Sequence, residues 1–104
     1  MTRFYHGSDL ELISLKKNSY VTKNFKDACK FGYRKSVLSG SPFVFIYSVE
    51  IETPEKSLEP DKNRDRAFVT LTQNKVKLMC KYLTFETPFK LEKFKKEIQE
   101  RSEI

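Results

Sequence analysis

The 104-residue chain has few cysteines and no long apolar run, and each shortage excludes a class of protein. Two cysteines are too few for a disulfide-rich secreted scaffold, so we expect Cys29 and Cys80 to be buried thiols outside any disulfide. No stretch approaches the roughly 18 consecutive apolar residues of a membrane span, and the residues before Phe4 contain no apolar signal-peptide segment. The sequence therefore predicts a cytoplasmic protein that does not enter a membrane.

A single histidine and three glycines exclude several common kinds of site. A zinc site needs about four Cys, His or carboxylate ligands at matched spacing, and His6 with two distant cysteines does not supply them. A Cys–His dyad also fits poorly, because Cys29 falls on the apolar face of a predicted helix and Cys80 in a predicted strand, whereas reactive thiols need electropositive, partly exposed surroundings. Three well-separated glycines form no glycine-rich phosphate loop. We therefore expect no metal ion.

Aromatic residues and positive charge are abundant. Nine Phe and five Tyr indicate a folded, Phe-rich core, and the length is suited to one domain. The net charge of +6 favours an anionic partner. Four basic residues would form one stripe on a helix, because they are spaced three, four and four apart: Lys23, Lys26, Lys30 and Arg34. This stripe is either a solvated helix face or a surface for a phosphate-bearing ligand or a nucleic acid.

The hydrophobic pattern predicts a domain dominated by strands. Strands are expected at residues 3–6, 19–22, 43–51, 67–71 and 75–86. The first is expected to end in a turn at Gly7 and Ser8. The third is a near-continuous apolar run, which indicates burial on both faces. The last alternates, with one apolar face formed by Val76, Leu78, Cys80 and Tyr82.

Two helices are predicted beside these strands. Asn24 is a suitable N-cap for a helix through about Lys35, whose apolar face repeats at helical spacing over Phe25, Ala28, Cys29 and Gly32. A closing helix is expected over about 88–101. The segment 9–18 fits either one helical turn or an irregular loop, and 52–66 reads as a polar loop. These elements predict a single α+β domain over residues 1–104, with one or two helices packed on a sheet.

Four motifs occur in an order and spacing that resemble the small ADP-ribosyltransferases. They are YHGS at 5–8, SYVTKNFKDACKFG at 19–32, FIYSVEI at 45–51 and LEPDKN at 58–63. The chain is most similar to the compact rifampin ADP-ribosyltransferases, where His-Gly-Thr, Tyr-x-Thr before an alanine-containing helix, a Val-Glu strand and an acidic loop follow one another. The similarity covers about Phe4 to Asn63 and extends more weakly through NRDRAFVTL. It implies the split β-sheet of that family.

The resemblance also implies how this chain would bind NAD. His6 would hydrogen-bond the ribose next to nicotinamide, and Gly7 would let backbone groups approach and hold the carboxamide. Ser8 either only turns the chain or contacts the nicotinamide amide. Tyr20 would stack on the nicotinamide ring, which an aromatic face can do without a charge.

A carboxylate completes the implied catalytic set. As nicotinamide leaves, C1′ of the ribose becomes cationic, and a carboxylate aimed at that charge lowers the barrier. Counting from the Val-Glu pair of the strand places Asp61 at the matching position, with Glu59 and Asp65 as near alternatives. The catalytic residues implied by the resemblance are therefore His6, Tyr20 and Asp61.

The implied activity is mono-ADP-ribosyl transfer, a glycosyltransferase reaction with NAD as co-substrate and nicotinamide as leaving group. Only 13 residues separate His6 from Tyr20, fewer than in the antibiotic-modifying enzymes, so we expect a macromolecular acceptor, protein or nucleic acid, and a monomeric enzyme. Two alternatives stay open. One is a catalytically inactive module of the same family that binds a nucleotide or a nucleic acid. The other is a small interaction protein whose family match is accidental.

Overall fold

A computed structural model of the chain describes residues 2–64 and 66–84. The predicted α+β class is confirmed, because antiparallel strands form one sheet and two helices accompany it. In sheet order the strands are β2 (Ser14–Leu15), β7 (Asn74–Leu83), β4 (Phe43–Ile51), β1 (Thr2–Ser8), β3 (Tyr20–Thr22), β6 (Ala67–Thr70) and β5 (Leu58–Pro60). The helices are α1 (Phe25–Ser39) and α2 (Pro54–Ser57). The helix expected over about 88–101 lies outside the described residues.

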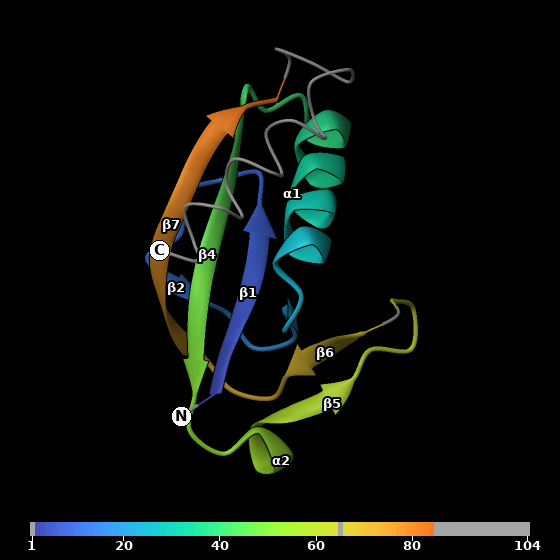
Figure 1. Cartoon of the computed structure of the whole chain (residues 1–104), viewed down its shortest axis with the longest axis vertical. Coiled ribbons are helices and arrows are strands. Elements are labelled where there is room, and N and C mark those ends of the chain that lie inside the picture. Colours follow the sequence, from blue (N-terminus) through green and yellow to red (C-terminus); the bar gives the residue numbers. More distant parts are fainter. Residues whose placement is uncertain (1, 65, 85–104) are drawn as a thin grey trace.

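The sheet is divided between β1 and β3. β1 pairs with β4 along its whole length, whereas its register with β3, within the described residues, is the single pair Tyr5 and Thr22. β1 and β3 then separate, and the β5–β6 hairpin lies apart from the long strands β1, β4 and β7 (Figure 1). At Gly7, the side of β1 that does not face β4 therefore has no strand partner among the described residues, and side chains occupy the space. This interruption of the strand pairing, here called the gap, positions the candidate site.

Apolar clusters lie on both faces of the sheet. On one face α1 covers the long strands (Figure 1), and Phe25 and Cys29 of the helix pack with Val44 and Ile46 of β4. The cluster on the opposite face is Phe4, Leu15, Val21, Val49, Ile51 and Leu58. Val44 and Ile46 of β4 join one cluster and Val49 and Ile51 join the other, so the predicted burial of this strand on both faces is confirmed.

Helix α1 approaches β1 closely where two glycines face each other. A Cβ atom placed on Gly7 would lie 2.0 Å from the Ala28 carbonyl oxygen and 2.6 Å from the Gly32 nitrogen. Both are backbone atoms of a packed helix, so neither can move without shifting the helix. Gly7 is therefore required by helix packing, independently of any role in binding. The turn predicted at Gly7 and Ser8 is wrong, because β1 continues through Ser8.

Helix α1 begins as predicted and ends later than predicted. The Asn24 side chain accepts a hydrogen bond from the Asp27 N–H, at 3.2 Å. The helix ends at Ser39 and is closed by Gly40 in the left-handed conformation, with φ 76°. The apolar repeat stops earlier because the next core position is Ser36, which is buried and donates its hydroxyl to the Phe43 carbonyl oxygen, at 2.7 Å. Because a polar residue occupies this core position, the apolar pattern did not reveal the last turn of α1.

The predicted single apolar face of β7 is wrong. Val76 packs in the cluster opposite α1, whereas Cys80 and Tyr82 pack in the cluster beneath α1. The cause is a register shift between Ile46 and Tyr47 of the neighbouring strand β4. One extra residue on β7 at this bulge moves every following side chain to the other face.

Two segments without strong periodicity contain short elements. The segment 9–18 is mostly irregular, and its two-residue strand β2 pairs with β7. The segment 52–66 contains α2 and β5. Both strands are too short to show an apolar alternation in the sequence. Cys29 is buried and Cys80 is half-buried, and no helix among the described residues is long and apolar enough to cross a membrane.

Candidate functional site

His6 and Tyr20 meet at the gap between β1 and β3. His6 Nδ1 lies 2.7 Å from the backbone oxygen of Tyr20, and the two rings lie 4.6 Å apart between centroids at an angle of 39°. Both side chains are buried. Tyr20 is held there because the preceding Ser19 exchanges backbone and side-chain hydrogen bonds with Thr70 of β6. The structure thus brings together the first two residues of the proposed catalytic set.

His6 is neutral and has a defined tautomer. The Tyr20 carbonyl oxygen can only accept, so Nδ1 carries the hydrogen and donates it. Burial, followed by the positive charge of Lys35, lowers the pKa of His6 to about 4, although the hydrogen bond to Tyr20 acts in the opposite direction. At neutral pH Nε2 is therefore unprotonated, and no hydrogen bond to it occurs within the described residues. It is an acceptor suited to a hydroxyl group.

The buried histidine makes stability depend on pH, with a sign that follows from its pKa. Its pKa in the folded chain, about 4, lies below the ordinary value of 6.5, so the unfolded chain binds more protons between these values. The contribution is fully present above pH 6.5 and is lost as the pH falls toward 4. We expect the free energy of unfolding to fall by about 3 kcal/mol as the pH is lowered from 6.5 to 4. Urea unfolding at several pH values measures this loss.

The same prediction can be tested at the residue itself. His6 is the one histidine of the chain, so its ring protons give an unambiguous NMR titration. A midpoint near 4 is expected for the folded protein. A midpoint near 6.5 would show that the imidazole is solvated and would contradict this geometry.

The Tyr20 hydroxyl holds both backbone groups of Gly7. It donates to the Gly7 carbonyl oxygen, at 2.8 Å, and accepts from the Gly7 N–H, at 3.0 Å. Burial raises the pKa of Tyr20 above its ordinary value, so the hydroxyl keeps its proton. The resemblance assigns the N–H and C=O of Gly7 to the nicotinamide carboxamide, but in this structure both groups are hydrogen-bonded to Tyr20.

Two cations cover the Tyr20 ring. The Arg64 guanidinium carbon lies 4.8 Å and the Lys35 Nζ 4.9 Å from the ring centroid, while Phe31 meets the ring edge-on at 5.0 Å. The sequence motifs did not single out Arg64, Lys35 or Phe31. Phe31 and Lys35 could have been found from their spacing. They lie four residues apart on α1, in one row with Asp27 and next to the row of residues that packs in the core.

Asp61 reaches this cluster through Arg64. Its Oδ2 pairs with Arg64 Nη1 at 2.8 Å, and its Oδ1 accepts from the Asn63 N–H at 2.8 Å. Partial burial acts to raise the pKa of Asp61, but the hydrogen bonds from Asn63 and Arg64 outweigh it and hold the pKa below its usual value. Of the alternatives, Glu59 is exposed on β5, and Asp65 lies outside the described residues.

Ser8, the last residue of β1, holds the bend that follows the strand through its side chain. Its hydroxyl donates to the Leu10 carbonyl oxygen, at 2.8 Å, and accepts from the Leu10 N–H, at 3.1 Å. Both ordinary hydrogen-bonding directions of this hydroxyl are therefore used in shaping the chain. Ser8 also lines the same depression as His6.

Two neighbouring depressions meet at Tyr20, Lys35 and Arg64, which line both. The histidine pocket, of about 360 Å³, is lined by His6, Ser8, Asp9, Lys16, Asn18 and Ser19 together with the shared residues. The basic groove, of about 510 Å³, is lined by Asp27, Lys30, Phe31, Arg34, Asn63 and Arg66 together with the shared residues. A ligand bound in one depression would therefore lie next to a ligand bound in the other.

Comparisons with known proteins add no family to this geometry. No protein-family model matches the chain, and neither a curated protein nor a solved structure matches it. Within residues 2–64 and 66–84, no three or more His, Cys, Asp or Glu side chains gather in a way that could hold a metal ion. The functional conclusion therefore depends on the residues of the site.

Proposed function

We propose that this chain is a cytoplasmic, monomeric mono-ADP-ribosyltransferase that cleaves NAD and transfers ADP-ribose to a macromolecule. One observation carries the proposal. At the gap in the sheet, the N–H and C=O of Gly7 bond to the same hydroxyl group, that of Tyr20, and the ring of Tyr20 lies 4.6 Å from the ring of His6 between centroids. A donor and an acceptor in one place, beside a second acceptor, suit the carboxamide and the ribose of nicotinamide riboside.

The internal hydrogen bonds of Tyr20 support this assignment. A hydroxyl can both donate and accept, and it satisfies Gly7 in that way. A carboxamide offers the same two functions, with its C=O for the Gly7 N–H and its NH₂ for the Gly7 C=O. Nicotinamide can therefore replace the Tyr20 hydroxyl without leaving either buried backbone group unsatisfied, which would otherwise cost about 1–3 kcal/mol.

The remainder of the dinucleotide fits the charges around the histidine pocket. A ribose hydroxyl would donate to His6 Nε2. The adjoining pyrophosphate would lie near Lys35 and Arg64, which line this pocket. Arg64 would then leave the Tyr20 ring, where its planar cation now covers the surface on which a nicotinamide ring would stack.

The reaction itself needs little covalent participation by the protein. The C1′–N bond breaks and its electron pair leaves with neutral nicotinamide, so positive charge develops on the ribose. The acceptor's lone pair then forms the new bond to C1′, and its proton passes to solvent. Asp61, released from Arg64 by the pyrophosphate, would stabilise the cationic ribose electrostatically.

Removal of the Tyr20 hydroxyl tests whether it competes with nicotinamide. Tyr20→Phe leaves the Gly7 N–H and C=O unoccupied, so we expect nicotinamide and NAD to bind about five- to tenfold more tightly, the equivalent of about one hydrogen bond. Calorimetric titration measures the affinity. Tyr82→Phe is the matched control, because it also removes a hydroxyl bonded to a backbone group, the Cys29 carbonyl oxygen at 3.4 Å, and neither Tyr82 nor Cys29 lines either depression. Equal or weaker binding by Tyr20→Phe would contradict the assignment of these groups to the carboxamide.

The activity is tested by incubating the purified protein with NAD and separating nicotinamide by chromatography. Protein-dependent nicotinamide release supports the transferase. Binding of NAD without release supports the second candidate, an inactive nucleotide-binding module. That candidate is favoured by one observation, the pairing of Asp61 with Arg64, because a carboxylate that stays neutralised cannot stabilise a cation. If the protein neither binds NAD nor releases nicotinamide, the family match is accidental.

A further inference from the structure

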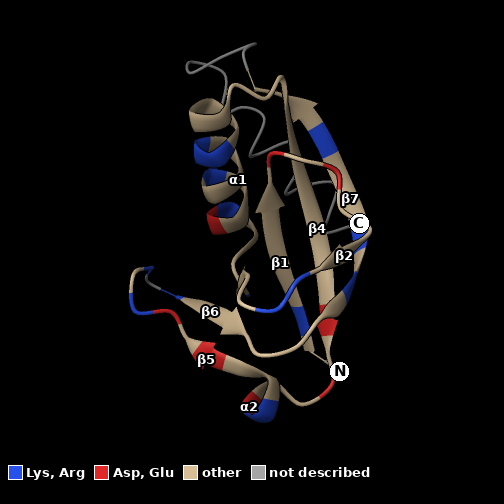
Figure 2. Cartoon of the chain, turned by 180° about the vertical axis from the view of Figure 1, so that it is seen from behind, with Lys and Arg blue, Asp and Glu red and all other residues tan. Residues whose placement is uncertain are grey.

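The basic groove carries more positive charge than the proposed dinucleotide site needs. Its lining contains five cations, Lys30, Arg34, Lys35, Arg64 and Arg66, and one carboxylate, Asp27. That carboxylate is paired with Arg66, at 3.1 Å. Figure 2 shows Lys and Arg in blue along α1 and in the loop between β5 and β6. The groove is therefore a strip of net positive charge bounded by a helix and a loop.

The chemistry of the groove fits a nucleic acid better than a protein partner. Lysine is depleted in the centre of protein–protein interfaces, and charged residues other than arginine are rare there. A phosphate backbone, in contrast, pairs with Lys and Arg over a continuous row of contacts. Phe31, half-buried, lines the groove together with Lys30 and Arg34. The Arg64 guanidinium carbon lies 5.7 Å from the centroid of its ring, so the ring offers an aromatic surface to a base once Arg64 moves aside.

The size of the groove favours a single strand. From Asp27 to Leu38, the lining residues on α1 extend over about 16 Å of helix. The volume of about 510 Å³ is in the range of small-molecule sites, so the groove encloses one or two nucleotides of a strand and is too small to enclose a duplex. Cations beside an aromatic ring are the usual means by which proteins hold single strands without reading their sequence.

We propose that the basic groove binds single-stranded nucleic acid, with phosphates on Lys30, Arg34 and Arg66 and a base on Phe31. This binding does not require NAD cleavage. Because the groove and the histidine pocket share Tyr20, Lys35 and Arg64, a bound strand lies next to the proposed NAD site. If the chain is a transferase, the strand is therefore its acceptor.

The test measures the anisotropy of a fluorescein-labelled single-stranded DNA 12-mer of mixed sequence, without NAD. With three phosphate contacts, on Lys30, Arg34 and Arg66, log affinity should fall against log salt with a slope of about −2, or about 20-fold between 50 and 200 mM. Lys30→Gln with Arg34→Gln should weaken binding on the order of tenfold and make the slope less steep by about 1.4. Phe31→Leu should weaken it about fivefold or more while the slope stays unchanged.

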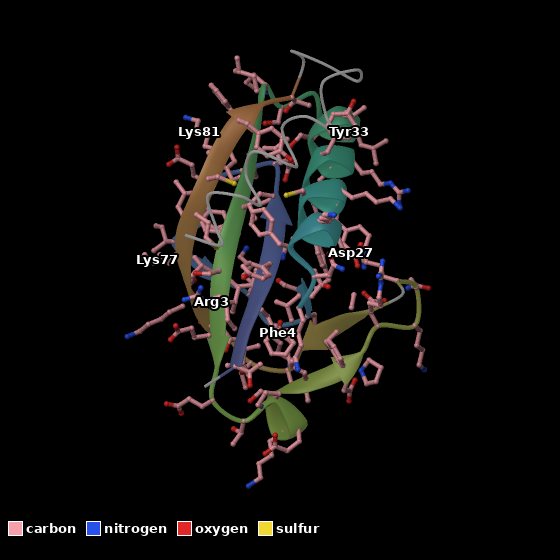
Figure 3. All side chains as sticks on the ribbon, viewed as in Figure 1. Arg3, Phe4, Asp27, Tyr33, Lys77 and Lys81 are labelled. Carbon is pink, nitrogen blue, oxygen red and sulfur yellow. The ribbon has the colours of Figure 1, made fainter. Side chains whose placement is uncertain are left out.

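The matched control removes the same charge elsewhere. Lys75 and Lys77 are exposed on β7, and Figure 3 places Lys77 across the sheet from Asp27 of α1. Lys75→Gln with Lys77→Gln should change affinity less than twofold. Equal losses in the two double variants would show that net charge alone binds DNA and would overturn the proposal. Equal affinity for the duplex, or for an acidic peptide of the same charge, would overturn it as well, and these results are independent of NAD cleavage.

Discussion

Gly7→Ala is expected to lower the free energy of unfolding by more than about 4 kcal/mol, which is a large part of the total stability of a small domain. The new methyl carbon would lie 2.0 Å from the Ala28 carbonyl oxygen and 2.6 Å from the Gly32 nitrogen. Overpacking of a core usually costs about 1–3 kcal/mol when side chains can rearrange. Here the obstructing atoms belong to the backbone of α1, so relief requires the whole helix to move away from β1.

Gly40→Ala is the control for this variant. Gly40 has a φ of 76°, but a Cβ atom there meets nothing within 4 Å. Its cost should therefore be limited to the left-handed backbone, about 1 kcal/mol. Urea unfolding followed by circular dichroism compares the two variants. Similar losses for Gly7→Ala and Gly40→Ala would show that α1 does not pack on β1 as described.

Asp61→Asn is expected to reduce the rate of nicotinamide release by about 10² to 10³ without weakening NAD binding, because the pyrophosphate no longer has to displace an ion pair from Arg64. The amide keeps an oxygen for the Asn63 N–H and nearly the same shape, so the loop should keep its fold. The lost charge meets a neutral ribose before the reaction and a cationic ribose in the transition state. Its effect should therefore appear in kcat rather than in binding.

Two further variants locate the carboxylate. Glu59→Gln serves as the control, because Glu59 is exposed on β5 and should leave kcat within about twofold. If Asp61→Asn retains full activity and Glu59→Gln or Asp65→Asn abolishes it, Asp61 is the wrong acid and another performs its role. Full activity in all three variants would contradict electrostatic stabilisation by a carboxylate of this loop.

Much of the fold could be predicted because local patterns were strong. The near-continuous apolar run from Phe43 to Ile51 predicted a strand buried on both faces, and β4 has that environment. Asn24 predicted the start of α1 because an asparagine side chain can accept a hydrogen bond from a free N–H of the first helical turn. The end of α1 was missed at Ser36, since burial of a serine depends on a partner, the Phe43 carbonyl oxygen, that only the folded chain supplies.

The prediction of a single apolar face on β7 was wrong for a different reason. Its sequence alternates regularly, yet the bulge beside Ile46 and Tyr47 reverses the faces halfway along it. A bulge is a property of two paired strands, so a pattern within one strand does not reveal it.

The candidate site was predictable in its members and not in its contacts. The motif order singled out His6 and Tyr20, and the structure places Nδ1 of His6 2.7 Å from the Tyr20 carbonyl oxygen. The hydrogen bonds between the Tyr20 hydroxyl and the Gly7 backbone depend on how far β1 and β3 separate, and no local sequence pattern specifies that separation. Arg64 was missed because a loop arginine has no periodicity that indicates the ring it covers.

The central claim is that the nicotinamide end of NAD binds at Gly7, in place of the Tyr20 hydroxyl. The most direct measurement is a titration of ¹⁵N-labelled protein with NAD, followed through the amide signals of the three glycines. The amide signal of Gly7 should shift strongly and saturate with the affinity measured by calorimetry, because its N–H changes partner from a hydroxyl to a carboxamide. Gly40, at the far end of α1, should stay unchanged. A saturable affinity for NAD with no shift at Gly7 would contradict the account.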